Sequence, residues 1–218
     1  MSFRSIGVQA EAGNVVPNEG GPVNLIVSEF LSLDGVMQAP GGPEEDRSGG
    51  FEHGGWQMPY FDEAAGNAIS EGMTTAGGFL LGRKTYEIFA GFWPSQPDDD
   101  PIAATLNNLP KYVASTTLEE PLEWRNATLL KGDVAEAVAK LKQQPGKDLH
   151  VIGSGELAQT LMRHDLVDEY RLMLHPLVLG SGRRLFRDGN PRAALRLVDS
   201  KTSSTGVLIL TYRPAKEQ

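Results

Sequence analysis

Short apolar runs alternate with segments of helical periodicity along most of this chain. The apolar runs have the length of buried strands and fall at Val23–Phe30, Gly78–Leu81, Lys111–Thr116, Leu149–Ile152 and Val167–Leu174. Apolar residues recur at helical spacing in the segments Tyr60–Thr74, Arg83–Phe89, Val134–Leu141 and Glu156–Met162. The near-continuous apolarity of the first run favours a central strand in a parallel sheet.

The last part of the chain predicts a hairpin. Leu195–Val198 and Val207–Tyr212 have strand character, and Ser203–Gly206 between them has turn composition. Alternating strands and helices followed by terminal strands imply an α/β protein with a mixed sheet flanked by helices.

Three stretches lack periodicity. Residues 1–21 are polar, so we expect a flexible N-terminal arm, and residues 22–218 then form a single domain. Pro40–Pro59 contains several glycines and is expected to be an active-site flap. Gly91–Pro110 is expected to be a polar loop whose aspartates are solvated.

Composition narrows the function classes. The net charge of −8 argues against a nucleic-acid surface, and no stretch has the ~20 apolar residues of a membrane span. The N-terminus has no signal-type apolar region, so a cytoplasmic location is expected. The absence of cysteine excludes disulfides, and the four histidines show no paired metal spacing, so no metal site is expected.

Two glycine segments carry the strongest functional signal. Gly82–Thr85 and Gly153–Glu156 each follow an apolar run and open a helical pattern. A strand-to-helix junction presents free backbone N–H groups and a positive dipole end, which suits a phosphate group. Glycine after a strand also serves as plain turn chemistry. Together, the two segments could hold a dinucleotide.

These segments belong to an ordered series of motifs, namely Ser32–Gly35, Leu81–Tyr86, Val113–Ser115, Val151–Gly155, Leu166–Leu172 and Pro176–Gly182. With them the chain resembles the dihydrofolate-reductase-like superfamily from about Val23 to Arg213. It is most similar to the riboflavin-biosynthesis reductases with a RibD C-terminal domain. The resemblance implies a three-layer α/β/α fold with a mixed, mostly parallel sheet, helices on both faces and a C-terminal antiparallel hairpin.

The resemblance also implies a cofactor site for NADPH. In that family the residues matching Arg83 and Ser115, with Thr116, grip the 2′-phosphate, whereas the residues matching Thr85 and Gly153–Leu157 hold the pyrophosphate. The implied cofactor-binding set is Gly82, Arg83, Thr85, Ser115, Thr116, Gly153, Ser154, Gly155, Glu156 and Leu157. Ser154 departs from the pattern, since the family commonly has adjacent glycines there.

The remaining candidates each have two interpretations. Asp34 is either a turn former or a catalytic residue near the nicotinamide. Asp62 is either a helix cap or an acid that acts on the substrate, although no acid of the first helix aligns with the folate-reducing members. Trp56 and Tyr60 either stack on a flat substrate or cap the core.

The function that the resemblance implies is hydride transfer from NADPH to a ribosylaminopyrimidine phosphate, as in 5-amino-6-(5-phosphoribosylamino)uracil reductases. Dihydrofolate reduction is one alternative. A non-catalytic nucleotide-binding protein on the same scaffold is another, because a fold does not fix a function. In each case the partner is a small heterocycle or nucleotide, and the resemblance implies a homodimer.

Overall fold

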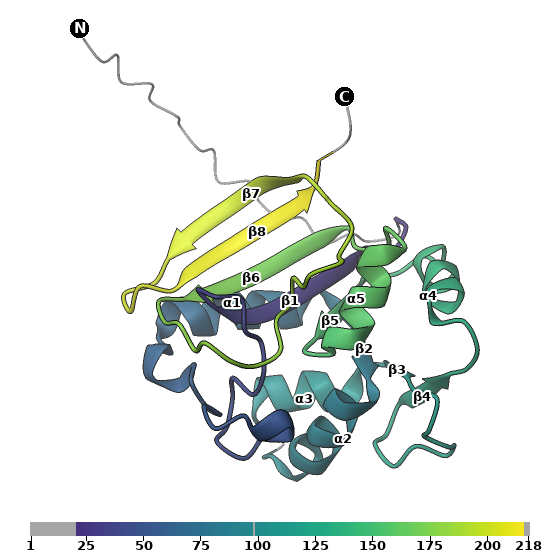
Figure 1. Ribbon diagram of the computed structural model, residues 1–218. Coiled ribbons are helices and arrows are strands. Elements are labelled where there is room, and N and C mark those ends of the chain that lie inside the picture. Colours follow the sequence, from purple (N-terminus) through teal and green to yellow (C-terminus); the bar gives the residue numbers. More distant parts are fainter. Residues whose placement is uncertain (1–20, 98, 216–218) are drawn as a thin grey trace, which may run out of the picture.

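The structure is a computed structural model, and it describes residues 21–97 and 99–215. One eight-stranded sheet forms its centre, with the strand order β4-β3-β2-β5-β1-β6-β8-β7 (Figure 1). The strands are β1 (Leu25–Ser32), β2 (Ala76–Gly82), β3 (Lys111–Ala114), β4 (Ala127–Leu130), β5 (Asp148–Ile152), β6 (Glu169–His175), β7 (Leu195–Thr202) and β8 (Leu208–Pro214). The predicted α/β class and the central place of the first strand are confirmed.

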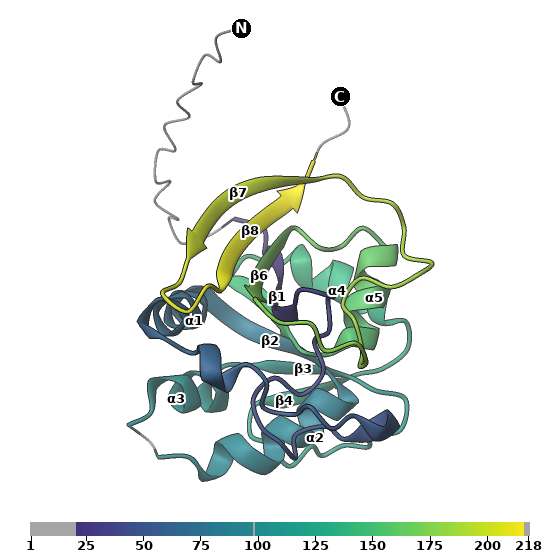
Figure 2. The same cartoon turned by 60° about the vertical axis from the view of Figure 1, so that its left-hand side comes forward.

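The sheet is mostly parallel. β1 pairs in parallel with β5 on one side and β6 on the other, and β2, β3 and β4 continue in parallel. β8 runs antiparallel to both β6 and β7, which confirms the predicted C-terminal hairpin. Figure 2 shows this hairpin curving strongly away from the rest of the sheet.

Helices and short 3₁₀ turns connect the strands. They are η1 (Ser48–Gly50), η2 (Met58–Tyr60), α1 (Glu63–Thr75), α2 (Arg83–Phe92), η3 (Trp93–Ser95), α3 (Pro101–Asn108), α4 (Val134–Lys142) and α5 (Gly155–Arg163). Every helix among the described residues is too short or too polar to cross a lipid bilayer.

The helices cover both faces of the sheet, and β2 shows how. Leu80 packs into a core cluster with residues of α4 and α5, such as Val138 and Leu161. Its neighbours Phe79 and Leu81 point to the opposite face, where they pack with residues of α2 and α3. Alternate side chains of one strand thus enter two separate cores, because successive residues of a strand point to opposite faces.

Two parts of the fold differ from what the sequence predicts, and one further prediction lies outside the described residues. The segment 91–110 is not the polar loop that its composition predicts. α2 continues to Phe92, and α3 begins at Pro101 behind an Asp100 cap that accepts bonds from the next two amides. The short edge strand β4 was missed altogether. The expected N-terminal arm lies outside the described residues, except for its last residue.

Candidate functional site

The two glycine segments meet at the carboxyl ends of β2 and β5, which are neighbours in the sheet. The Gly82 backbone N–H donates to Ser154 Oγ at 2.9 Å, and the Ser154 backbone N–H donates to Thr85 Oγ1 at 2.9 Å. Ser154 Oγ in turn donates to the Ile152 carbonyl at 2.9 Å. The serine that departs from the family pattern is therefore the residue that ties the two segments together.

The backbone of the second segment is strained in a way that favours glycine. Gly153 has a φ of 57°, and a Cβ there would lie 3.0 Å from Thr85 Oγ1. Ser154 also has a φ of 57°, which is rare for a residue with a side chain. Its three hydrogen bonds to the first segment and to β5 hold it in that conformation.

A large cavity opens in front of these segments. Its volume of about 3090 Å³ exceeds that of ordinary small-molecule pockets, so a dinucleotide and a second ligand fit together. All ten residues of the implied cofactor-binding set line it, namely Gly82, Arg83, Thr85, Ser115, Thr116, Gly153, Ser154, Gly155, Glu156 and Leu157. Residues from three segments of the sequence are thereby brought to one surface.

Two polar side chains of this set remain available to a ligand. Arg83 pairs with Glu87 at 2.9 Å, but both side chains are nearly half exposed, at 49% and 44%. An exposed pair of this kind contributes only about 0.3–0.5 kcal/mol, so an anionic ligand can replace it. Ser115 Oγ accepts bonds from the Thr117 and Leu118 backbone amides and lies 3.5 Å from Thr117 Oγ1, a long contact that a ligand's phosphate oxygen can replace.

The helix N-termini add to this electropositive edge. α2 begins at Arg83 and α5 at Gly155, both directly after strands. The first amides of a helix have no partner within the helix, and the dipole places positive charge there. The cavity wall at this edge therefore combines a guanidinium, hydroxyls and two helix ends, which is a chemistry suited to phosphate groups.

Asp34 is placed outside the cavity lining. Its carboxylate accepts bonds from Ser32 Oγ, from the Leu179 and Gly180 amides, and from Arg184. Burial acts to raise the pKa of Asp34, but these bonds outweigh burial and hold the pKa well below its ordinary range. The geometry therefore supports the turn-forming interpretation.

Asp62 is also outside the cavity lining. It caps α1 by accepting the Ala65 amide at 3.0 Å, and it accepts both the amide and the hydroxyl of Ser204 in the β7–β8 turn. The Ala65 amide and the Ser204 hydroxyl lower the pKa of Asp62 to about 2. The carboxylate thus joins a helix to the hairpin, and the geometry supports the cap.

Trp56 and Tyr60 do not line the cavity either. Trp56 is buried, donates its indole N–H to the Gln38 carbonyl at 2.7 Å and packs edge-on against His175. Tyr60 contacts the same imidazole from another side. The geometry supports the core-capping interpretation of Trp56, because the indole fills a small core cluster with Val36 and other apolar residues.

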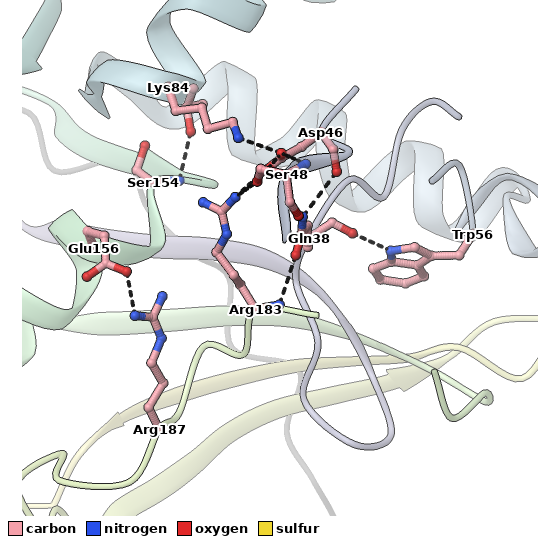
Figure 3. Close-up of polar contacts among 10 residues, drawn as sticks. Gln38, Asp46, Ser48, Trp56, Lys84, Ser154, Glu156, Arg183 and Arg187 are labelled. Atoms are coloured by element: carbon pink, nitrogen blue, oxygen red, sulfur yellow. Dashed lines mark hydrogen bonds and ion pairs between the residues drawn. The ribbon is translucent and has the colours of Figure 1, made fainter. Parts of the chain in front are cut away.

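An ionic network holds the loop between β1 and α1 in place (Figure 3). Asp46 of this loop pairs with Lys84 of α2 at 2.5 Å and with Arg183 at 2.8 Å. Arg183 also donates to Ser48, and its amide donates to Gln38. Burial acts to raise the pKa of Asp46, but the Lys84, Ser48 and Arg183 contacts lower it overall. The loop is therefore fastened to both sides of the cavity.

A second ion pair lies at the start of α5. Glu156 pairs with Arg187 at 2.5 Å, and Figure 3 shows the two side chains side by side. A Cβ on Gly155 would lie 3.2 Å from Arg187 Nη2. Arg187 thus packs close to the backbone where the helix begins.

Sequence reasoning missed two buried polar groups on the cavity wall. Glu29 on β1 and His150 on β5 both line the cavity, and each has a buried polar atom without a hydrogen-bond partner among the described residues. Burial, and then the Arg171 charge, lower the pKa of His150 to about 3. The available signal was a charged or titratable residue inside an otherwise apolar strand.

The sheet is an open α/β sheet, and ligands of such sheets bind outside the carboxyl ends of the strands, where the two glycine loops lie. The sequence model of the RibD C-terminal domain matches residues 23–209, and the chain belongs to that family. The Bacillus subtilis protein YyaP, described as uncharacterized, is 36% identical over 136 residues, which cover 61% of this chain and 71% of YyaP. YwjB of the same organism, likewise uncharacterized, is 28% identical over 78% of this chain and 87% of its own length.

Solved structures share the fold. A putative riboflavin biosynthesis protein from Shewanella sp. PV-4 superposes with a TM-score of 0.69 at 22% identity, covering 89% of this chain and all of that one. Enterococcus faecalis dihydrofolate reductase, complexed with NADP(H) and RAB-propyl, gives 0.58 at 15% identity, with 90% and 99% covered. A pyrimidine reductase-like protein from Corynebacterium diphtheriae gives 0.57 at 13% identity, with 92% and 94% covered. The chain thus has the dihydrofolate-reductase-like fold.

Proposed function

We propose that this protein is an NADPH-dependent reductase of the riboflavin-biosynthesis type. Its substrate would be a ribosylaminopyrimidine phosphate, as in 5-amino-6-(5-phosphoribosylamino)uracil reductases. The observation that carries the proposal is the interlocking of two glycine segments on a cavity that also presents Arg83 and Ser115. Membership of the RibD C-terminal domain family supports the same activity.

The residues present fit the cofactor. The Gly153–Gly155 backbone turns beside Thr85, and Gly155 opens α5, whose first backbone amides would hold a pyrophosphate. Arg83 at the start of α2 and Ser115 after β3 would bind a 2′-phosphate with a charge and a hydroxyl. When bound, the nicotinamide supplies the hydride.

The chain's own residues would orient the reactants and exclude water. The loop held by Asp46 lies along one wall of the cavity, and Lys84 and Arg183 fasten it there. A closed, dry site strengthens the electrostatic contacts that hold a polar substrate. The heterocycle would lie in the part of the cavity that the cofactor leaves free.

Turnover tests this proposal. Purified protein is mixed with NADPH and either 5-amino-6-(5-phosphoribosylamino)uracil or dihydrofolate, and loss of NADPH absorbance is followed. Faster oxidation with the pyrimidine supports the proposed substrate class. Faster oxidation with dihydrofolate supports the alternative activity, and NADPH binding without oxidation supports a non-catalytic nucleotide-binding protein.

One observation supports dihydrofolate reduction as the alternative activity, and one speaks against it. The fold is shared with a dihydrofolate reductase. However, Asp62 and Glu63 at the start of α1 lie outside the cavity lining, and only Glu71 of that helix offers a carboxylate to it. The folate alternative therefore depends on Glu71.

We further infer that the protein is a homodimer, as family membership suggests. β7 is an edge strand, and the hairpin exposes the apolar residues Leu197, Val198 and Leu208. Exposed apolar side chains on a sheet edge favour association with another copy. Light scattering coupled to gel filtration measures the mass directly, and a monomer mass would contradict the inference.

A further inference from the structure

Glu29 is a buried carboxyl group on the wall of the cavity. It lies on β1, the side chain is 6% exposed, and Oε1 has no hydrogen-bond partner in the part of the chain that the structure describes. Burying a carboxyl group without partners is costly unless it remains protonated or a ligand pairs with it. The Gly153 backbone hydrogen-bonds to this carboxyl group, Oε1 is the oxygen left without a partner among the described residues, and its position suggests a ligand.

Glu29 lies beside the glycine segment that follows β5. Ser28 pairs with Ile152 in parallel register, so Glu29 follows at the level of Gly153. The Gly153 backbone interacts with the Glu29 carboxyl. Ligands of open parallel sheets bind outside the carboxyl ends of the strands, and Gly153 directly follows the end of β5. Glu29 therefore adjoins the glycine segment to which the proposed function assigns the cofactor.

The surroundings of Glu29 favour the neutral acid. Burial raises its pKa well above the ordinary value of 4.5, the Gly153 backbone partly offsets this, and Glu45 raises the pKa further. The charged and titratable side chains on the elements around this part of the cavity are Glu44, Glu45, Asp46, Arg83, Lys84, His150, Glu156, His164, Glu169, Arg171, Arg183 and Arg187. Asp46 is paired with Lys84 and Arg183, and Glu156 with Arg187, so these charges are largely balanced locally.

The two candidate acids from the sequence analysis are not placed to donate a proton in the cavity. Asp34 and Asp62 are outside the cavity lining, and each carboxylate already accepts several hydrogen bonds. The pKa of each is lowered, so neither holds a proton to donate near neutral pH. Glu29 meets both requirements of a general acid, which are a position in the cavity and a retained proton.

We propose that Glu29 is the catalytic acid that donates a proton to the substrate during reduction. This inference rests on the proposed function. The substrate's carbon–nitrogen or carbon–oxygen double bond gains a hydride at carbon and a proton at the heteroatom. The hydride's two electrons come from the reduced nicotinamide, which becomes oxidised, and the proton comes from the Glu29 carboxyl. The resulting carboxylate takes a proton from water before the next turnover.

The test compares Glu29→Gln, Glu29→Asp and a matched control, Glu136→Gln. Glu136 is an exposed carboxylate of α4 outside the cavity lining, and it pairs with Lys140 at 2.6 Å. For each protein, NADPH binding is measured by tryptophan fluorescence. The rate of reduction of 5-amino-6-(5-phosphoribosylamino)uracil and of dihydrofolate is then measured across pH.

The Glu29→Gln protein is expected to bind NADPH normally and to lose about 100-fold or more in kcat, which is the usual contribution of a general acid. The wild-type kcat should fall as pH rises through the pKa of Glu29, and this decline should be absent from Glu29→Gln. Glu29→Asp, which keeps an acid, should recover part of the rate. Glu136→Gln should behave as wild type.

Three results would contradict the inference, and they are distinguishable. Wild-type kcat and pH dependence in Glu29→Gln would remove the proton-donating role and leave the reductase assignment intact. Loss of NADPH binding in Glu29→Gln would make Glu29 a cofactor-holding residue instead. A wild-type protein that binds no NADPH, or reduces neither substrate, would overturn the proposed function and the inference with it.

Discussion

The backbone N–H of Ser154 donates to the hydroxyl of Thr85 at 2.9 Å, across 69 positions of sequence. This bond joins the loop before α5 to the first turn of α2. It fixes the spacing between two helix N-termini that face one cavity. The geometry of the proposed phosphate site thus depends on a contact that neither segment can form alone.

We predict that Thr85→Val weakens both the fold and cofactor binding. Valine has nearly the same shape but leaves the Ser154 N–H unpaired, which costs about 1–3 kcal/mol. Urea unfolding measures the stability, and fluorescence titration measures NADPH binding. Thr85→Ser keeps the acceptor and should stay close to wild type. Equal stability of Thr85→Val and Thr85→Ser would show that the bond contributes little.

Gly153→Ala should lower the free energy of unfolding more than Gly132→Ala, although both glycines have a left-handed backbone conformation. Gly153 has a φ of 57°, and its Cβ would lie 3.0 Å from Thr85 Oγ1. Gly132 has a φ of 80° with nothing within 4 Å of its Cβ. Gly132→Ala therefore reports only the backbone cost of about 1–2 kcal/mol, and Gly153→Ala adds the steric clash. Identical losses of stability in the two variants would contradict the close contact.

Glu29 should make stability depend on pH in a defined direction. Its folded pKa is raised above the ordinary value of 4.5, so its contribution is fully present below that pH and is lost as pH rises towards the folded pKa. Relative to wild type, Glu29→Gln should gain about 1.4 kcal/mol per pH unit over that interval. Denaturant unfolding at several pH values tests this. A pH-independent difference would mean that Glu29 is ionised in the folded protein.

Asp62 should act on stability and not on turnover. The Ala65 amide and the Ser204 hydroxyl lower its folded pKa to about 2, from an ordinary 3.8. Its contribution is therefore present above pH 3.8 and is lost as pH falls towards 2. Asp62→Asn should lower the Tm at neutral pH and leave kcat within about two-fold. A steep loss of kcat with an unchanged Tm would restore Asp62 as a catalytic candidate.

Local patterns sufficed to predict the centre of this fold. β1, β2 and β5 are largely apolar, and the glycine segments follow β2 and β5 directly. α3 was missed because polar residues precede it, although Asp100 followed by Pro101 is a recognisable helix start. β4 is four residues long and depends on pairing with β3, a contact that no local pattern indicates.

The site was less predictable than the fold. The residues near the glycine segments could be assigned because helix starts and strand ends are local features. The burial of Trp56 depends on His175, which is distant in sequence. Whether an acid such as Glu29 is buried without partners depends on the loops and strands around it. The sequence therefore indicates where phosphate groups bind better than it indicates which acid supplies a proton.

The most direct measurement is the titration of this protein with NADPH and, separately, with NADH, followed by tryptophan fluorescence. We predict NADPH binding at least about tenfold tighter than NADH binding, because Arg83 and Ser115 would contact the 2′-phosphate. Arg83→Ala should abolish this preference, whereas Arg163→Ala, an exposed arginine outside the cavity, should keep it. Equal affinity for the two dinucleotides, or binding of neither, would contradict the account.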